Sequence, residues 1–125
     1  MILGIGIDLT NIPRIERLLK NWGDKFKKRV FSQQEMDYSQ RHKRSSEHFA
    51  ANFAVKEAFS KAIGKGFKGN MRMLDIEVQR DEDGKPYVNL YGRAKQLAEM
   101  KKINSVHVSI SHDGDYATAV VILEK

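Results

Sequence analysis

The chain of 125 residues lacks cysteine, and its apolar N-terminal stretch, residues 1–7, is short and meets an aspartate at position 8. The absence of cysteine excludes disulfide bridges, thiolate metal sites and thiol nucleophiles, and it suits a reducing compartment. Seven residues without a basic flank are too few for a signal peptide or a membrane span. We therefore expect a cytoplasmic protein with no membrane partner.

Acidic residues are also scarce, with 16 Asp and Glu against 22 Lys and Arg, which gives a net charge of +6. Much of the positive charge is concentrated in residues 14–44. Such a surplus steers polyanions toward a protein, so nucleic acid, coenzyme phosphates and acidic proteins all qualify as partners. A small basic nucleic-acid-binding protein remains an alternative, although no RNP, KH or helix-turn-helix signature is present and no nucleic acid is expected.

The length fits one domain, residues 1–125, and no linker, repeat or low-complexity segment interrupts it. The pattern predicts a strand over residues 1–8, and then a helix capped by Asn11 with Pro13 in its first turn. One apolar face of this helix is expected to contain Ile12, Ile15, Leu18, Leu19 and Trp22. A capping box of Ser32 and Glu35 predicts a second helix to about residue 41, followed by a basic connector over residues 41–44.

The longest predicted helix runs from Ser46 to a terminal glycine at Gly64. Small side chains recur along it at four-residue intervals and allow a neighbouring element to pack closely, at Ala50, Ala54, Ala58 and Ala62. Residues 74–91 and 106–123 alternate like two hairpins, with a short helix to about residue 102 between them. The predicted class is α+β, an antiparallel sheet with a long buried helix.

Two carboxylates stand out, Asp8 at the end of the apolar strand and Glu57 on the buried helix. Mg²⁺ accepts hard oxygen ligands of this kind and takes one or two of them together with substrate phosphates. The alternative is a purely structural role for both residues, in which Asp8 caps the following turn and Glu57 pairs with Lys61. The same carboxylates with water as nucleophile would also suit a Mg²⁺-dependent nucleotide hydrolase.

Two further groups of residues are candidates for phosphate contacts. Gly64, Lys65 and Gly66 belong to a basic glycine-rich loop, whose backbone can approach phosphate oxygens, although an ordinary helix end is the alternative and the spacing is not that of a P-loop. One face of the predicted strand near the end of the chain contains His107, Ser109 and Ser111, and His112 follows at the turn. An imidazole there holds a phosphate, takes a proton, or is a structural hydrogen bonder.

Three stretches taken together resemble the holo-[acyl-carrier-protein] synthases, the small trimeric class of 4'-phosphopantetheinyl transferases. They are Gly-Ile-Asp at residues 6–8, Phe-Ala-Val-Lys-Glu-Ala at residues 53–58, and Ser-Ile-Ser-His at residues 109–112 followed by Tyr-Ala at 116–117. The resemblance implies the 4'-phosphopantetheinyl transferase fold and a Mg²⁺-dependent transfer of 4'-phosphopantetheine from coenzyme A to a serine of apo acyl carrier protein. Adenosine 3',5'-bisphosphate would be released, in support of fatty acid biosynthesis.

The resemblance also implies roles for single residues. Asp8 and Glu57 would hold Mg²⁺ against the coenzyme A diphosphate, and Lys61 would add positive charge there. Glu57, directly or through a metal-bound water, would activate the serine, with His112 as the rival base. Coenzyme A contacts are expected from Lys43, Arg44, Phe53, Lys61, Gly64, Lys65, Gly66, His107 and Ser109.

The resemblance further implies partners and one departure. The acidic carrier protein would meet Arg14, Arg17 and Lys20 on the first helix, and the chain would form a homotrimer with active sites at subunit interfaces. Family members commonly have arginine where this chain has Asn52. Our hypothesis is that a basic residue elsewhere replaces that arginine, with the candidates Lys43, Arg44 and Lys65.

Overall fold

The computed structural model describes residues 1–64 and 67–125 of the chain. The elements in order are β1 (Ile2–Asn11), α1 (Ile12–Trp22), α2 (Asp24–Val30), α3 (Gln33–Gln40), α4 (Ser45–Ile63), the 3-10 helix η1 (Met73–Asp75), β2 (Ile76–Arg80), β3 (Pro86–Leu90), α5 (Gly92–Met100), β4 (Ser105–Asp113) and β5 (Tyr116–Glu124). Helices combine with antiparallel strands, and the α+β prediction is confirmed.

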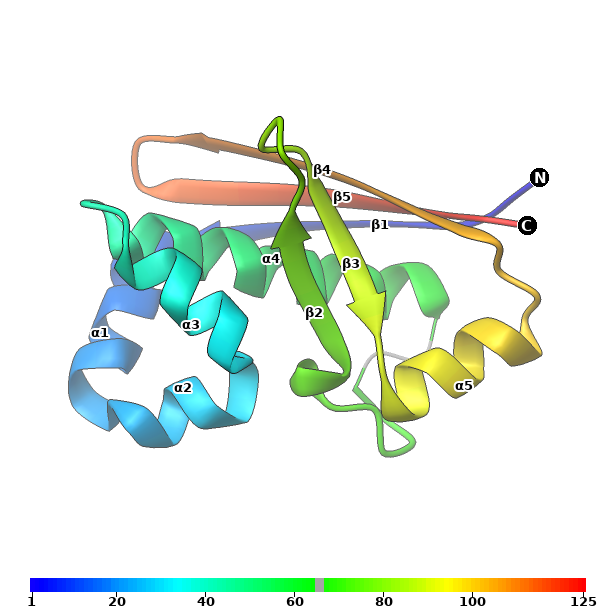
Figure 1. Ribbon diagram of the computed structural model, residues 1–125, viewed down its shortest axis with the longest axis horizontal. Coiled ribbons are helices and arrows are strands. Elements are labelled where there is room, and N and C mark those ends of the chain that lie inside the picture. Colours follow the sequence, from blue (N-terminus) through cyan, green and yellow to red (C-terminus); the bar gives the residue numbers. More distant parts are fainter. Residues whose placement is uncertain (65–66) are drawn as a thin grey trace.

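The long helix α4 lies between two antiparallel sheets (Figure 1). A three-stranded sheet with the order β1-β5-β4 runs along one side of α4, and the β2-β3 hairpin crosses its other side. Helices α1, α2 and α3 gather around one end of α4, while α5 lies near the opposite end (Figure 1). None of the described helices is both long enough and apolar enough to cross a membrane.

Close approach between β1 and α4 depends on glycine in the strand and alanine in the helix. A Cβ atom added at Gly6 would overlap the carbonyl oxygen of Ala58, and one at Gly4 would overlap that of Ala62. Glycine in a strand typically marks such an approach of another backbone. The predicted small-residue stripe of α4 is therefore confirmed as the surface on which β1 packs.

The two faces of the three-stranded sheet differ in chemistry because side chains alternate along each strand. Inward-facing Ala119, Val121 and Leu123 of β5 are buried against α4. On the outward face, by contrast, Ile5 and Ile7 of β1 are 62% and 59% exposed. The sheet thus covers the core with one apolar face, and its outward face is apolar along β1.

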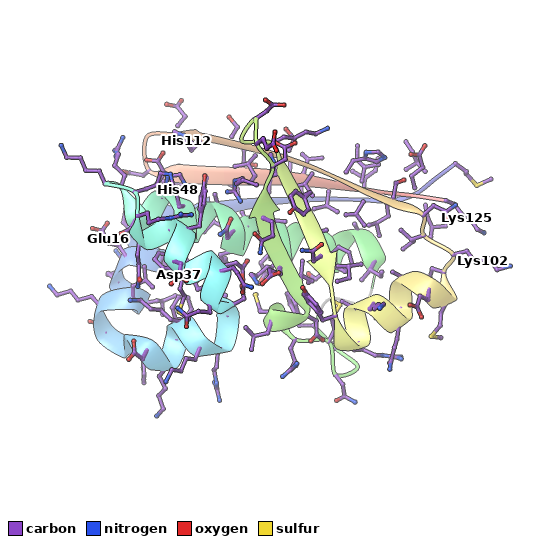
Figure 2. All side chains as sticks on the ribbon, viewed as in Figure 1. Glu16, Asp37, His48, Lys102, His112 and Lys125 are labelled. Atoms are coloured by element: carbon purple, nitrogen blue, oxygen red, sulfur yellow. The ribbon has the colours of Figure 1, made fainter. Side chains whose placement is uncertain are left out.

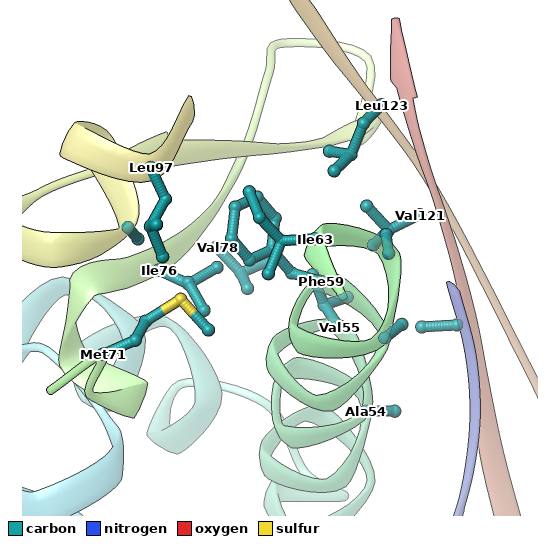
Figure 3. Close-up of a cluster of buried hydrophobic side chains, with 14 residues drawn as sticks. Ala54, Val55, Phe59, Ile63, Met71, Ile76, Val78, Leu97, Val121 and Leu123 are labelled. Carbon is teal, nitrogen blue, oxygen red and sulfur yellow. The ribbon is translucent and has the colours of Figure 1, made fainter. Parts of the chain in front are cut away.

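The main core fills the space between α4, the hairpin and the sheet (Figure 3). Val55, Phe59 and Ile63 of α4 supply its bulk. The hairpin and α5 contact them through Ile76, Val78 and Leu97, and the sheet does so through Val121 and Leu123.

The structure corrects several local predictions. Trp22, placed on the core face of the first helix, is 60% exposed, because α1 ends there and Gly23 turns the chain into α2, a helix the sequence pattern missed. Residues 73–75 form η1, so the hairpin begins at Ile76 rather than at residue 74. Helix α4 begins at Ser45, one residue earlier than predicted. The capping box of Ser32 with Glu35 and the left-handed glycine at Gly64 are both confirmed.

Candidate active site

Asp8 and Glu57 are brought to one edge of the three-stranded sheet. β1 is the edge strand, and its alternation places Asp8 on the same face as Gly6, toward α4. Lys61 follows Glu57 by one helical turn, and its Nζ lies 3.2 Å from Asp8 Oδ1. The negative charge of Asp8 also raises the pKa of Glu57, which places the two carboxylates within electrostatic reach of each other.

Two threonine hydroxyl groups hold Asp8 in place. Thr10 Oγ1 donates to Asp8 Oδ2 at 2.6 Å, and Thr118 Oγ1 of β5 donates to the Asp8 carbonyl at 2.8 Å. Lys61 Nζ donates to the carbonyl of Ile7 at 2.9 Å as well as to Asp8. The sequence reasoning missed both threonines, although the two-residue spacing of Asp8 and Thr10 on a strand was a usable signal. The contact between Thr118 and Asp8 depends on the pairing of β5 with β1, which spacing along one strand does not reveal.

The environment of Glu57 raises the pKa of its carboxyl group. Burial is the main cause of its raised pKa and the charge of Asp8 is the second, while Lys61 and Arg14 act in the opposite direction. Among the described residues no hydrogen bond to its carboxylate oxygens is present. The purely structural alternative, with Asp8 as a cap and Glu57 paired with Lys61, is wrong. Lys61 pairs with Asp8, and β1 continues past Asp8 to Asn11, which is the residue that caps α1.

The donor set fits a hard divalent cation. Asp8 and Glu57 offer carboxylate oxygens and no softer ligand, and Mg²⁺ typically takes one or two carboxylates and completes its shell with water and phosphate. Within residues 1–64 and 67–125, no group of three or more His, Asp or Glu side chains gathers into a protein-only metal cage. A cation at these two carboxylates would also relieve the repulsion that raises the pKa of Glu57.

Some of the predicted carrier and coenzyme residues also lie near this edge. The guanidinium carbon of Arg14 lies 5.8 Å from the ring centroid of Phe53, and its charge lowers the pKa of Glu57. Arg14, Arg17 and Lys20 are all exposed on α1. Gly64 ends α4 with φ of 83° directly after the turn that contains Lys61. Lys65 and Gly66 lie outside the described residues.

Other predicted site residues are distant from Asp8 within one chain. His107 and Ser109 are exposed on the outward face of β4, and His107 Nε2 lies 2.9 Å from Glu124 Oε1. This contact with His107 lowers the pKa of Glu124. His112, expected at the turn, lies within β4 near its end, and its Nε2 is 3.0 Å from Glu47 Oε1. The single chain therefore does not unite His107 and Ser109 with the two carboxylates.

The basic residues before α4 form a separate corner. Lys43 and Arg44 are exposed, and Arg44 Nε lies 3.4 Å from Glu47 Oε2. Both line a cavity of about 410 Å³ between α1, the start of α4 and the β4–β5 turn. The side chain of Asn52 contacts a cation of β2, because Arg80 Nη2 donates to Asn52 Oδ1 at 3.1 Å. No sequence signal singled out Arg80.

Comparison with known proteins assigns this architecture to a family. Residues 4–121 match the 4'-phosphopantetheinyl transferase superfamily. The chain is 45% identical over 124 residues to a holo-[acyl-carrier-protein] synthase of Syntrophus aciditrophicus, covering 99% of this chain and 97% of that one. The structure matches that of the Neisseria meningitidis holo-[acyl-carrier-protein] synthase with a TM-score of 0.90 and 36% identity, over 100% of both chains.

A further solved structure contains a ligand. It is the Helicobacter pylori holo-[acyl-carrier-protein] synthase in complex with coenzyme A, with a TM-score of 0.85, 35% identity, and coverage of 96% of this chain and 99% of that one. Sequence and fold thus agree over nearly the whole length. The chain therefore belongs to the 4'-phosphopantetheinyl transferase superfamily, as an enzyme of its holo-[acyl-carrier-protein] synthase branch.

Proposed function

We propose that the chain, acting as one transferase domain over residues 1–125, transfers 4'-phosphopantetheine from coenzyme A to a serine of apo acyl carrier protein. The reaction requires Mg²⁺, releases adenosine 3',5'-bisphosphate and supports fatty acid biosynthesis in the cytoplasm. The observation that carries this proposal is the grouping of Asp8, Glu57 and Lys61 at one sheet edge. The coenzyme A complex of the Helicobacter pylori relative supports the choice of co-substrate.

Asp8 and Glu57 are the residues that would hold the metal. Bound Mg²⁺ supplies Lewis acidity and neutralises charge on the diphosphate. Lys61 is exposed and contacts Asp8 only at the surface, so its ammonium group can turn toward phosphate oxygens when coenzyme A binds. Thr10 and Thr118 hold Asp8 in place during this exchange.

In the transfer step, the serine oxygen of the carrier forms a bond to the phosphorus of the pantetheine phosphate while the anhydride bond to adenosine 3',5'-bisphosphate breaks. Glu57 would take the hydroxyl proton, because among the described residues nothing donates a hydrogen bond to its carboxylate oxygens, which leaves them able to accept it. His112 is the rival base, but its imidazole lies against Glu47 near the end of β4. A pH–rate profile of His112→Ala decides between them, because loss of the near-neutral ionisation would count against Glu57.

We also propose that the chain forms a homotrimer. The outward sheet face exposes Ile5, Ile7 and Leu9 of β1, which are 62%, 59% and 65% accessible. Contiguous exposed apolar surface of this kind marks a protein interface. His107 and Ser109 lie on the same outward face, so a neighbouring copy would bring them to the edge of β1 and complete the coenzyme site.

The carrier protein is proposed to dock on α1. Arg14, Arg17 and Lys20 project from it as exposed cations, and such a patch attracts an acidic partner electrostatically. Beside these residues, Leu18 and Trp22 line a shallow cavity of about 270 Å³ that can receive an apolar side chain.

The transferase is tested by incubating the protein with apo acyl carrier protein, coenzyme A and Mg²⁺, and weighing the carrier by intact-mass spectrometry. We expect a mass gain of one phosphopantetheine group, which Asp8→Ala and Glu57→Ala abolish and which the exposed-residue control Glu99→Ala retains. Equal activity in all three variants would contradict the metal assignment. No mass gain with any carrier would contradict the transferase itself.

A further inference from the structure

The two carboxylate oxygens of Asp8 have different partners. Oδ2 accepts a hydrogen bond of 2.6 Å from Thr10 Oγ1, and Oδ1 lies 3.2 Å from Lys61 Nζ. Thr10 has an exposed fraction of 0%, whereas the side chain of Lys61 is 53% exposed. One oxygen of Asp8 is therefore held by a buried hydroxyl group, and the other contacts a cation at the protein surface.

The partner of Oδ2 is fixed. Thr10 follows Asp8 by two residues on β1, so both side chains lie on the inward face of the strand. Among the described residues, Asp8 is the only acceptor for the hydroxyl proton of Thr10. A buried hydroxyl group that loses its acceptor pays a desolvation penalty, which is larger than the gain from an exposed contact. This penalty keeps Oδ2 turned toward Thr10.

The partner of Oδ1 can leave. Nζ of Lys61 also donates to the carbonyl of Ile7 at 2.9 Å, so the ammonium group keeps one contact when it separates from Asp8. An exposed ion pair of this kind contributes little to stability, because water screens it and solvates both partners. A cation that arrives from solvent therefore meets Oδ1, and it takes the place that Lys61 occupies.

The donor atoms available at this edge are carboxylate oxygens. Glu57 supplies the second carboxylate of the pair. His48 and His112 line a different cavity, between α3, the hairpin tip and the end of β4 (Figure 2). Imidazole ligands would suit Zn²⁺ or Cu²⁺, whereas carboxylates and water suit Mg²⁺, Mn²⁺ and Ca²⁺. The choice within this last group depends on how many carboxylate oxygens the site offers to one ion.

We propose that Thr10 restricts Asp8 to monodentate coordination, which makes the site select Mg²⁺ against Ca²⁺. Ca²⁺ takes more oxygen ligands and readily binds both oxygens of one carboxylate, whereas Mg²⁺ requires a strict octahedron and keeps several waters. With Oδ2 held by Thr10, only Oδ1 is left for the ion, and a cation that binds there displaces Lys61. The inference rests on the proposed function, because it takes Asp8 as a metal ligand.

The test follows Mn²⁺ on the protein without coenzyme A by electron paramagnetic resonance, with Mg²⁺ and Ca²⁺ titrated in turn as competitors. In the wild type, Mg²⁺ should compete better than Ca²⁺. Thr10→Val removes the hydroxyl group and keeps the size of the side chain. It should reduce the preference for Mg²⁺ by about tenfold, the size of effect that is typical when a hydrogen bond to a metal ligand is lost.

Two further variants separate the hydroxyl group of Thr10 from a general change in β1. Thr10→Ser keeps the hydroxyl group and should retain the preference of the wild type. Thr118→Val is the matched control, because Thr118 donates to the backbone carbonyl of Asp8 and not to its carboxylate. An equal change of preference in Thr10→Val and Thr118→Val would overturn the proposal, since the effect would then come from the backbone.

The displacement of Lys61 is tested separately, at an exposed position, which keeps the test valid if Thr10→Val unfolds. Lys61→Met should strengthen Mn²⁺ binding by up to about fivefold, because the ion no longer has to separate an ion pair. Arg14→Met is the control for charge alone, since Arg14 acts on Glu57 electrostatically while Asp8 pairs with Lys61. An equal gain in the two variants would overturn the displacement of Lys61.

The variant Asp8→Asn distinguishes a failure of this inference from a failure of the proposed function. Absence of Mn²⁺ binding, or binding that Asp8→Asn leaves unchanged, would contradict the metal assignment and this inference with it. Mn²⁺ binding that Asp8→Asn abolishes would support the metal assignment. If the preference for Mg²⁺ over Ca²⁺ were then the same in Thr10→Val and the wild type, the role of Thr10 alone would be overturned.

Discussion

Helix α4 contains two lysines that pair with carboxylates, Lys56 and Lys61, and the two pairs have opposite surroundings. Lys56 and its partner Glu35 have side chains that are 0% exposed, with Nζ 2.9 Å from Glu35 Oε1. The Lys61 side chain is 53% exposed, and its Nζ lies 3.2 Å from Asp8 Oδ1. Burial makes the first pair a part of the core, while exposure leaves the second free to exchange its partner for a ligand.

The hydrogen bonds of Lys56 show why it is structural. Its Nζ donates to Glu35 Oε1, to the Met73 carbonyl at 2.9 Å and to the Ile76 carbonyl at 2.6 Å, which uses all three of its protons. Glu35 is saturated as well, since it also accepts from the backbone N–H groups of Ser32 and Val78. Such a pair joins α3, α4, η1 and β2 and has no capacity left for a substrate.

The largest expected effect comes from removing the buried cation. Lys56→Met leaves Glu35 charged, buried and without its cation, and breaking a pair of this kind costs about 3–5 kcal/mol of unfolding free energy. Chemical denaturation monitored by circular dichroism would measure the loss. The double variant Lys56→Met with Glu35→Leu should recover much of it, because the stranded charge is gone. A double variant as unstable as the single one would contradict this account.

Gly6→Ala should disturb the exposed pair of Lys61 and Asp8 by displacing the backbone of β1. The new methyl group would overlap the Ala58 carbonyl oxygen and push β1, with Asp8, away from α4, while the Lys56 pair keeps its partners. We expect a destabilisation of about 3 kcal/mol, at the upper end of overpacking effects, together with lost transferase activity. Gly114→Ala is the control, because its added methyl group meets open space and only its positive φ of 58° is strained. Equal losses of stability in the two variants would contradict the close-packing argument.

Lys61→Met should separate stability from activity. The pair with Asp8 is largely exposed, so its removal should change the unfolding free energy by less than about 1 kcal/mol. Under the proposed role of Lys61 as a contact to the coenzyme phosphates, its loss should lower kcat by about 10²-fold or more. Denaturation and carrier-labelling assays on the same preparation would show both effects. A large loss of stability with normal labelling would make Lys61 a structural residue like Lys56.

Much of the fold followed from local sequence signals. The capping box at Ser32, the glycine at Gly64 and the alanine stripe of α4 each act within a few residues, and the structure has all three. Trp22 was misplaced because helical periodicity cannot show where the packed part of a helix ends. Helix α2 has seven residues and a basic sequence, too short for an amphipathic pattern to stand out.

The candidate site was less accessible to sequence reasoning. Asp8 and Glu57 stood out in the sequence as carboxylates on an apolar strand and a buried helix, and the resemblance strengthened their assignment, but their proximity depends on how β1 packs against α4. The pairing of Lys56 with Glu35 could not be predicted, because the two residues are 21 positions apart in the sequence. Arg80 gave no signal at all, since its relation to Asn52 arises from a hairpin that folds back onto α4. Long-range contacts of this kind are not contained in periodicity or spacing.

The smallest expected effect concerns the contribution of Glu57 to the folding stability of the protein. The folded protein raises the pKa of Glu57, so ionisation of this group disfavours folding. The protonated form of Glu57 therefore stabilises the folded protein at low pH, and this contribution is lost as the pH rises through the pKa of Glu57 in the folded state. Glu57→Gln should therefore raise Tm at neutral pH, by no more than about 4 °C because solvent screens the group. The gain should vanish below the ordinary glutamate pKa of about 4.3, where the wild type is protonated in both states.

Thermal unfolding from pH 3 to pH 8 would measure this difference, with Glu99→Gln as the exposed control that shows no such trend. Mg²⁺ together with coenzyme A should stabilise the wild type and reverse the order of the two proteins, because the bound cation favours the ionised carboxylate that the glutamine variant lacks. A Glu57→Gln variant that is less stable than the wild type at neutral pH without ligand would mean that Glu57 is held by favourable contacts. Glu57 would then resemble Glu35, the buried structural partner of Lys56, rather than a carboxylate that is available to bind a metal.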